Sequence, residues 1–287
     1  MKHRVNFTPL CDRSRLRGIR SIAALGMSEV LSREGLHPDL VVGCSAGAIF
    51  GALIAAGHDA REAVHIASTL WSPEITRQRR WRAVPRMLFP RIGRFDADFA
   101  LRDDRLIVER LERAFGDSRL EDLSLPLRVT AIDAATGDPV VIRRGRVVDA
   151  LRASIALPFM FKSVKIDGRR LIDGFVSDPL PVSAAADAQS VVLLGFPSPM
   201  PRRVDLPSRM LAQVTAAMTN NLMEARLAAA KVGCIGMVGI FPKLERRVGL
   251  FDTEAISYLV DSGRRATEAQ LSTIMAMIDG TQRLAAA

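Results

Sequence analysis

The chain has 287 residues, of which 48% are hydrophobic and 25% are charged, values that are ordinary for a soluble globular protein. Its formal net charge of +9 favours contact with nucleic acid, anionic lipid or acidic partners without choosing among them. The odd number of cysteines, Cys11, Cys44 and Cys234, argues against a framework built only of disulfides and favours a reducing compartment.

Taken in chain order, hydrophobic spacing and turn residues predict helices and strands that alternate. Helices are expected at Ile19–Arg33, Ala48–Ala56, 59–72, Arg105–Phe115, Val147–Ala156, 206–232 and Thr253–Met277. Strands are expected at Leu40–Val42, Leu127–Asp133, Pro139–Arg143, Val164–Ile166, Leu171–Ile172 and Val191–Leu194. The segment Val5–Leu10 contains a proline and favours a strand only poorly. The alternation indicates an α/β layered fold with a largely parallel sheet.

No linker rich in Gly, Ser or Pro and no internal repeat divides the sequence, so we expect a single domain over residues 1–287. Within it we expect a basic and aromatic cap near 71–100 and a helical C-terminal part from about residue 206. The N-terminus lacks the apolar segment of a signal peptide, and Ala48–Ala56 is far shorter than the ~20 residues of a membrane span. These features predict a cytoplasmic protein that can touch a membrane peripherally without crossing it.

The segment Gly43-Cys44-Ser45-Ala46-Gly47 fits the pattern G-x-S-x-G of a nucleophile elbow. Such an elbow places a serine on a strained turn between a strand and a helix, and its glycines avoid clashes within the turn. The helix that follows directs its N-terminus at the site, which favours negative charge there. The alternative is a glycine-rich turn without chemistry. Cys44 is expected to point into the protein as a packing residue.

A histidine base is hard to reconcile with this elbow. The chain has four histidines, His3, His37, His58 and His65, and none follows residue 65, so the order Ser, acid, His is impossible with Ser45 as nucleophile. A carboxylate can act on the serine directly when partial desolvation raises its pKa. The best candidate is Asp173, which follows a predicted strand and precedes Gly174; the alternative is a simple turn aspartate.

Two blocks of sequence together carry a family resemblance. The first runs from Arg17 to Gly57 and includes the elbow; the second is Ala153–Phe161 (A-S-x-A-x-P-x-x-F), followed by a hairpin and Asp173-Gly174. With these blocks the chain resembles the patatin-like phospholipase family. The resemblance implies a three-layer α/β/α sandwich with a mostly parallel central sheet. It also implies a Ser–Asp dyad that cleaves lipid carboxylic esters through an acyl-enzyme, in the manner of a phospholipase A or lysophospholipase.

Carried over by position, the resemblance makes Ser45 the nucleophile and Asp173 the base. The backbone near Arg17, Gly18 and Ala46 would hold the oxyanion, and Gly43 and Gly47 would shape the elbow. Phe159 and Phe175 are assigned to the substrate pocket, and Phe175 stands where the family has a small residue.

The family's glycine-rich loop, G-G-G-x-[RK]-G, is altered in this chain. Arg13–Gly18 aligns with it, and only Arg17-Gly18 match. Because glycines let backbone N–H groups approach an oxyanion closely, this change motivates an alternative function, a non-catalytic lipid- or partner-binding protein of the same family.

Possible partners follow from the remaining composition. Aromatic side chains interleave with arginines over 71–95, which suits an anionic membrane and equally suits nucleic acid. No nucleic-acid-reading motif is present, so we expect a lipid ester substrate and no specific nucleic acid. Met210, Met218 and Met223 of the predicted helix 206–232 are expected to fill the core. No metal-ligand cluster and no phosphate-binding loop occurs, so no metal and no cofactor is predicted, and nothing indicates an oligomeric state.

Overall fold

The computed structural model describes residues 4–9, 18–70, 72, 74–77, 96, 99–197, 200–201, 203–233, 236–246, 248–249 and 252–286. Most of the cap expected near 71–100 lies outside these residues, as do Arg17, Cys11 and Cys234.

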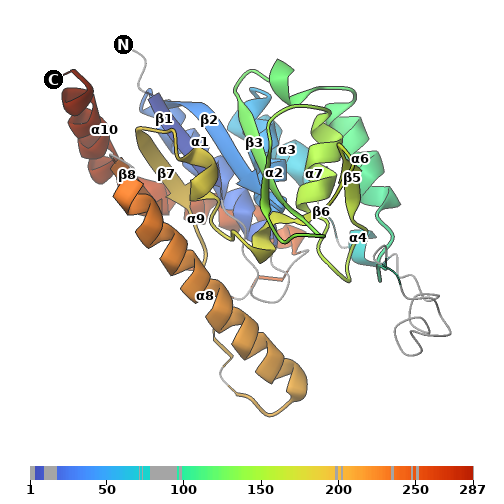
Figure 1. Cartoon of the computed structure of the whole chain (residues 1–287). Coiled ribbons are helices and arrows are strands. Elements are labelled where there is room, and N and C mark those ends of the chain that lie inside the picture. The colour runs from blue at the N-terminus through green and yellow to red at the C-terminus, as the bar shows by residue number, and fades with distance from the viewer. Residues whose placement is uncertain are drawn as a thin grey trace.

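The described strands form one eight-stranded sheet at the centre of the molecule (Figure 1). They are β1 (Arg4–Pro9), β2 (His37–Cys44), β3 (Leu127–Asp133), β4 (Pro139–Ile142), β5 (Val164–Ile166), β6 (Arg169–Asp173), β7 (Ser190–Leu194) and β8 (Gly236–Ile240). Neighbouring strands follow the order β5-β6-β3-β2-β1-β7-β8, and β4 pairs with β3 off this path. The strands β3, β2, β1, β7 and β8 pair in parallel, whereas β4, β5 and β6 join through antiparallel pairs. The sheet therefore has the expected parallel centre with an antiparallel edge.

Strand β1 departs from the sequence expectation, since the pattern of Val5–Leu10 favours a strand only poorly. In the structure it lies between β2 and β7 and pairs in parallel with both. Pro9 is the last residue of β1 and lies opposite Leu194, the last residue of β7. Its missing N–H group therefore falls where the strand ends, and the partners on both sides stabilise a segment that has a weak local preference.

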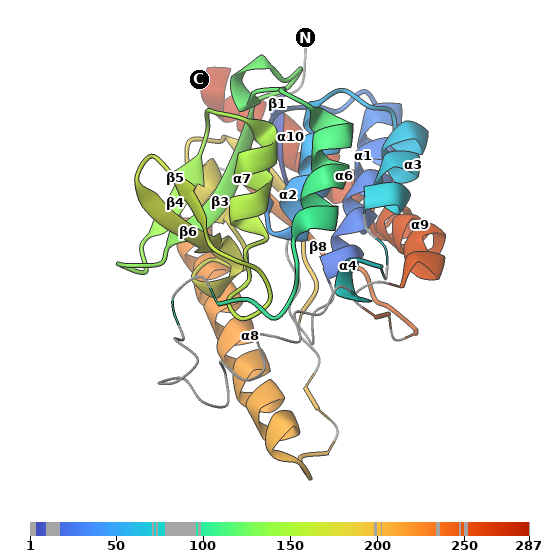
Figure 2. The same cartoon turned by 90° about the vertical axis from the view of Figure 1, so that its right-hand side faces the viewer.

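Helices cover both faces of the sheet (Figures 1 and 2). The α-helices are α1 (Ala23–Arg33), α2 (Ala46–Ala55), α3 (Ala60–Leu70), α4 (Glu74–Arg77), α6 (Arg105–Phe115), α7 (Val147–Ser154), α8 (Pro207–Gly233), α9 (Ile256–Glu268) and α10 (Leu271–Ala286). Short 3-10 helices are η1 (Gly18–Ile22), η2 (Leu120–Asp122), η3 (Gly174–Val176), η4 (Val182–Ala185) and η5 (Thr253–Ala255).

The side chains of β2 show how the sheet separates two helical layers. Val41 belongs to a core cluster with residues of α1, α2, α3, α6, α7, α9 and α10. Its neighbours Leu40 and Val42 belong to a second cluster with η4 and Met223 of α8. Because successive side chains of a strand point to opposite faces, the sheet lies between these two layers. The expected three-layer α/β/α architecture is confirmed.

The C-terminal helical part differs from the single helix expected over Thr253–Met277. The segment forms η5, α9 and α10, with a break at Ala269 and Gln270. The amide of Ala269 still donates to the Arg265 carbonyl, but Gln270 N–H donates to the carbonyl of Thr267, only three residues back. This tightened last turn ends α9 and lets α10 start in a new direction.

Two glycines allow α1 and α9 to touch. A Cβ atom on Gly26 of α1 would lie 2.0 Å from the Val260 carbonyl oxygen, and one on Gly263 of α9 would lie 2.1 Å from the Ala23 carbonyl oxygen. Any larger residue at either position would push the helices apart. The two glycines therefore allow α9 to pack closely on α1, the helix that precedes β2 and Ser45.

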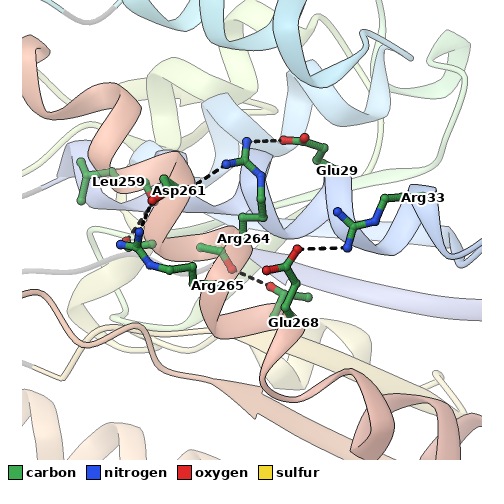
Figure 3. A network of polar contacts seen from close by, with 10 residues as sticks. Glu29, Arg33, Leu259, Asp261, Arg264, Arg265 and Glu268 are labelled. Atoms are coloured by element: carbon green, nitrogen blue, oxygen red, sulfur yellow. Dashed lines mark hydrogen bonds and ion pairs between the residues drawn. The ribbon is translucent and has the colours of Figure 1, made fainter.

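Ion pairs flank this helix contact (Figure 3). Arg264 of α9 pairs with Glu29 of α1 at 2.8 Å, and Arg33 of α1 pairs with Glu268 of α9 at 3.0 Å. These pairs are partly exposed, so each stabilises the contact only modestly. Across the described ranges, no helix combines the length and apolar character needed to cross a bilayer.

Candidate active site

Ser45 stands on a sharp turn between β2 and α2. Its backbone angles are φ 52° and ψ −131°, a left-handed conformation that a non-glycine residue adopts at a cost of about 1–3 kcal/mol. The turn is tight enough that a Cβ atom on Gly43 would lie 2.4 Å from the Cα atom of Ala48. Ala46 and Gly47 are buried and form the first turn of α2. The turn therefore has the strained and tightly packed backbone that an elbow requires, and its chemical role stays a prediction.

Ser154, the last residue of α7, is hydrogen-bonded to the backbone of the Ser45 turn. The Ser154 hydroxyl accepts a 2.7 Å hydrogen bond from the Ser45 amide and donates a 2.8 Å bond to the carbonyl of Thr130 on β3. Ser154 is fully buried. The bonds tie the strained turn to the sheet, and they occupy the Ser45 amide, which is therefore no oxyanion donor. Sequence reasoning assigned no role to Ser154, although it lies within the Ala153–Phe161 block.

The carboxylate of Asp173 accepts a hydrogen bond from the hydroxyl of Ser45. The distance from Ser45 Oγ to Asp173 Oδ2 is 2.8 Å. The other carboxylate oxygen, Oδ1, accepts the amide of Phe175 at 2.9 Å, and the Asp173 amide donates to the Ala156 carbonyl at 3.1 Å. Asp173 is 3% exposed, so the carboxylate is fixed in orientation and largely shielded from water. The residues expected to form the dyad are in direct contact.

Strand register explains why these side chains meet. Thr130 of β3 lies opposite Cys44 of β2 on one side and opposite β4 on the other. The next residue, Ala131, lies opposite β4 again and opposite Asp173 of β6. Because β4 occupies the same edge in both cases, β2 and β6 share the other edge of β3. They run in opposite directions, so their carboxyl ends converge, and Ser45 follows directly after Cys44.

Gly174 and Phe175 continue from the end of β6. A Cβ atom on Gly174 would lie 2.7 Å from the Thr130 carbonyl oxygen, so a glycine is needed where the chain crosses β3. Phe175 is 4% exposed and packs against Cys44, which is fully buried. The packing role expected of Cys44 is confirmed. Phe175 lies beneath the elbow, and its place in a substrate pocket stays a prediction.

Phe159 lies on the loop that follows α7. It is 57% exposed, and its ring meets that of Phe99 edge-on with centroids 6.2 Å apart. The carbonyl of Phe159 accepts the amide of Leu101 at 2.9 Å. The loop is thus attached to the segment that follows the expected cap, and the exposed ring is available to a ligand. Its substrate contact stays a prediction.

The region expected to hold the oxyanion is only partly described. Gly18 is buried as the first residue of η1, while Arg17 lies outside the described residues. Ala46 begins α2, whose first amides lack partners within the helix and carry partial positive charge. Gly18 and Ala46 remain the predicted donors.

The described histidines lie away from the dyad. His37 is the first residue of β2, at the end opposite Ser45, and His65 is exposed on α3. His58 Nδ1 lies 2.9 Å from Glu62 Oε2 beyond the end of α2. Among the residues with described positions, no group of three or more His, Cys, Asp or Glu side chains could hold a metal ion.

Several known proteins are similar to this chain in sequence or in fold. An uncharacterized NTE family protein of Mycobacterium bovis, Mb1092c, is 32% identical over 169 residues, which are 59% of this chain and 43% of that protein. The protein YqhO of Bacillus subtilis is 28% identical over 190 residues, which are 58% of this chain and 62% of that protein. This chain therefore spans less than two thirds of the length of either relative. The solved structure of VipD from Legionella pneumophila has a TM-score of 0.53 at 15% identity, over 96% of this chain and 67% of VipD, which shows a shared fold.

A family model described as patatin-like phospholipase matches residues 17–186, more than half of the chain. The matched range contains the elbow, the Ser154 hydroxyl that holds it, and Asp173. The chain belongs to the patatin-like phospholipase family.

Proposed function

We propose that this chain hydrolyses carboxylic esters of lipids with Ser45 as nucleophile and Asp173 as general base. The observation that carries the proposal is the 2.8 Å hydrogen bond from Ser45 Oγ to Asp173 Oδ2 at the end of an elbow. A nucleophile within hydrogen-bond reach of an oriented base is the arrangement that covalent acyl transfer requires.

In the proposed reaction Asp173 Oδ2 accepts the Ser45 proton as Oγ attacks the ester carbonyl carbon. The carbonyl oxygen becomes an oxyanion, which the amides near Gly18 and Ala46 and the N-terminus of α2 would stabilise. As the C–O bond breaks, Asp173 returns the proton to the leaving alcohol, and an acyl-enzyme remains on Ser45. Water then gives a proton to Asp173 and attacks the acyl carbon. Release of the acid returns the proton to Ser45.

The shape of the dyad supports a direct role for the carboxylate. The Phe175 amide holds Oδ1, which leaves Oδ2 aimed at the serine. Because Asp173 is almost completely buried, bulk water does not replace the Ser45 hydroxyl as the hydrogen-bond donor to its carboxylate. We further propose that the protein acts in the cytoplasm, in peripheral contact with a membrane.

Hydrolysis of short- and medium-chain p-nitrophenyl esters tests the dyad. We expect Ser45→Ala and Asp173→Asn each to lower kcat by at least ~10³-fold, because each removes a group that acts in the transition state. Asp167→Asn is a matched control, since Asp167 also precedes a glycine but is exposed in the β5–β6 turn. A fluorophosphonate probe should label wild type and fail on Ser45→Ala.

The altered loop at Arg13–Gly18 favours a second candidate, a non-catalytic protein that binds lipid or a partner. If wild type turns over no faster than Ser45→Ala and the probe leaves Ser45 unlabelled, the hydrolase proposal is wrong and this second candidate takes its place.

A further inference from the structure

Helix α8 extends well beyond the body of the molecule in both views (Figures 1 and 2). Its C-terminal half packs on the sheet, where Met223 is 8% exposed and Leu227 and Ala230 lie against the same core cluster. The N-terminal half carries large apolar side chains that are at least half exposed: Met210, Leu211, Val214 and Met218. We call these four residues the α8 stripe.

The stripe corrects the sequence expectation for the methionines. Met223 fills the core as expected, but Met210 is 60% exposed and Met218 is 67% exposed. The spacing of the stripe is helical, so its members share one side of α8. The apolar character continues into the preceding segment, where Met200, Val204 and Leu206 are also exposed. Soluble monomers rarely leave a contiguous apolar surface of this kind uncovered.

The stripe lies beyond the same edge of the sheet as the dyad. β2 ends just before Ser45, β7 runs parallel to it, and α8 returns from beyond that edge to enter β8. Arg226 of α8 donates to the Ser177 carbonyl at 3.3 Å, four residues after Asp173. At ~1.5 Å of rise per residue, the stripe begins roughly 12 Å and ends roughly 24 Å from Arg226 along the helix.

Two further apolar side chains are exposed close in sequence to residues of the candidate site. Val176, in η3 beside Asp173, is 45% exposed, and Phe159 is 57% exposed. These exposed side chains give the candidate active site an apolar rim of its own that could meet the same lipid surface.

We propose that the α8 stripe inserts into the surface of an anionic lipid bilayer and so holds Ser45 against its substrate. This inference rests on the proposed function and adds the surface that brings lipid to the site. From Leu206 to Met223 the sequence has one charged residue, Arg209, which pairs with Asp205. A helix satisfies its own backbone hydrogen bonds, so its apolar side can enter the acyl boundary at little polar cost.

The charge of the chain and the character of α8 favour a lipid surface over other partners for the α8 stripe. Arg203 is exposed in the segment that leads into α8, and the whole chain carries +9, which complements anionic headgroups. α8 is among the described helices that cannot cross a bilayer, so it would lie in the interface. A second copy of the chain would bring the same positive charge to the contact.

Flotation of the full chain with vesicles of phosphatidylcholine and phosphatidylglycerol tests the proposal. The protein carries Ser45→Ala, so that binding is measured without hydrolysis. We expect Met210→Glu combined with Leu211→Glu to weaken vesicle binding by at least about tenfold, because two apolar side chains become charged at the interface. Val232→Glu is the matched control: Val232 is 90% exposed at the far end of the same helix and should leave binding unchanged. Circular dichroism checks that each variant keeps its fold.

The outcomes separate this inference from the proposed function. If the folded double variant floats as well as Ser45→Ala alone, the stripe does not dock on lipid. The same holds if the double variant keeps vesicle binding and only loses a dimer, as measured by size-exclusion chromatography. Wild-type hydrolysis of a soluble p-nitrophenyl ester would then leave the hydrolase proposal intact. Conversely, stripe-dependent flotation of a protein that hydrolyses no ester would support docking and overturn the hydrolase alone.

Discussion

The contact between Ser45 and Asp173 is positioned by a few polar atoms outside the pair. Ser154 uses one hydroxyl to join the strained Ser45 turn to the Thr130 carbonyl. Asp173 is oriented by the amide of Phe175. The motif and the family resemblance singled out Ser45 and Asp173, which lie 2.8 Å apart, and their catalytic roles stay predictions. The motif and the resemblance could not predict Ser154, since a serine at a helix end is common and its partners are distant in sequence.

We predict that Ser154→Ala lowers kcat on a soluble ester by about 10–100-fold with little change in KM. The variant leaves the Ser45 amide and the Thr130 carbonyl without their shared partner, so the elbow relaxes while the binding surface stays. Ser190→Ala is the control, because Ser190 is equally buried and bonded to Thr281 at 2.9 Å but lies at the start of β7. Both variants should lose about 1–3 kcal/mol of stability, and only Ser154→Ala should lose activity. Equal kcat values would show that the clamp is structural only.

Asp178 illustrates a buried carboxylate outside the dyad. Burial raises its pKa, against the opposing effects of the Ser183 hydroxyl, which donates to Oδ2 at 2.7 Å, and of the Arg226 charge. Its Oδ1 atom has no hydrogen-bond partner among the described residues. A raised folded pKa means that the folded state binds the proton more tightly than the unfolded state. Stability is therefore lost as pH rises from the unfolded pKa through the folded pKa.

We predict that Asp178→Asn raises the thermal midpoint at neutral pH, and that this gain shrinks as pH falls toward about 3. Asp187→Asn should behave in the opposite way, because Arg128 lowers the pKa of Asp187 to about 2. Its stabilising pair is present at neutral pH and is lost as pH falls through about 2. Asp187 is largely exposed, so its loss should cost less than ~1 kcal/mol. Thermal unfolding across pH measures both, and a destabilised Asp178→Asn at neutral pH would refute the first claim.

At the scale of elements, contacts distant in sequence decide what local patterns leave open. The strongly periodic elements, such as β3, α6 and α8, form within a residue or two of their predicted bounds. The local pattern of β1 favours a strand only poorly, because the strand is stabilised by its pairing with β2 and β7 on either side. The break at Ala269 was missed because helix-forming residues continue through it. The exposure of the α8 stripe could not be predicted, since periodicity marks an apolar side but not what covers it.

We predict that Gly263→Ala destabilises the protein by about 1–3 kcal/mol, because its Cβ atom would lie 2.1 Å from the Ala23 carbonyl oxygen and would force α1 and α9 apart. Gly280→Ala is the matched helical control, since nothing lies within 4 Å of its Cβ position in α10. It should be neutral or stabilise by up to ~1 kcal/mol. Urea unfolding measures both. Equal stability of the two variants would mean that the helix contact tolerates a wider spacing.

At the scale of the whole molecule, the parts that matter for the proposed function gather at one edge of the sheet. The carboxyl ends of β2 and β6 meet there, and α8 extends beyond the same edge (Figure 1). Composition predicted a basic chain that could contact nucleic acid, anionic lipid or acidic partners, and the fold adds an exposed apolar stripe on α8, a helix joined to the segment after Asp173 by the bond from Arg226 to the Ser177 carbonyl. Residues 187–287 follow the matched family range, yet they supply α9, which packs on α1, and α8, which carries the stripe.

The convergence of β2 and β6 on β3 also sets when the proposed activity could arise during synthesis. Ser45 and Asp173 are 128 positions apart, and the register of β3 alone brings them together. When the Ser45 turn has left the ribosome, Asp173 has not yet been placed beside it. β6 has to leave the exit tunnel and pair with β3 before the proposed base can reach Ser45. Under the proposed function, a growing chain would therefore be unable to hydrolyse a lipid ester until β6 has paired with β3.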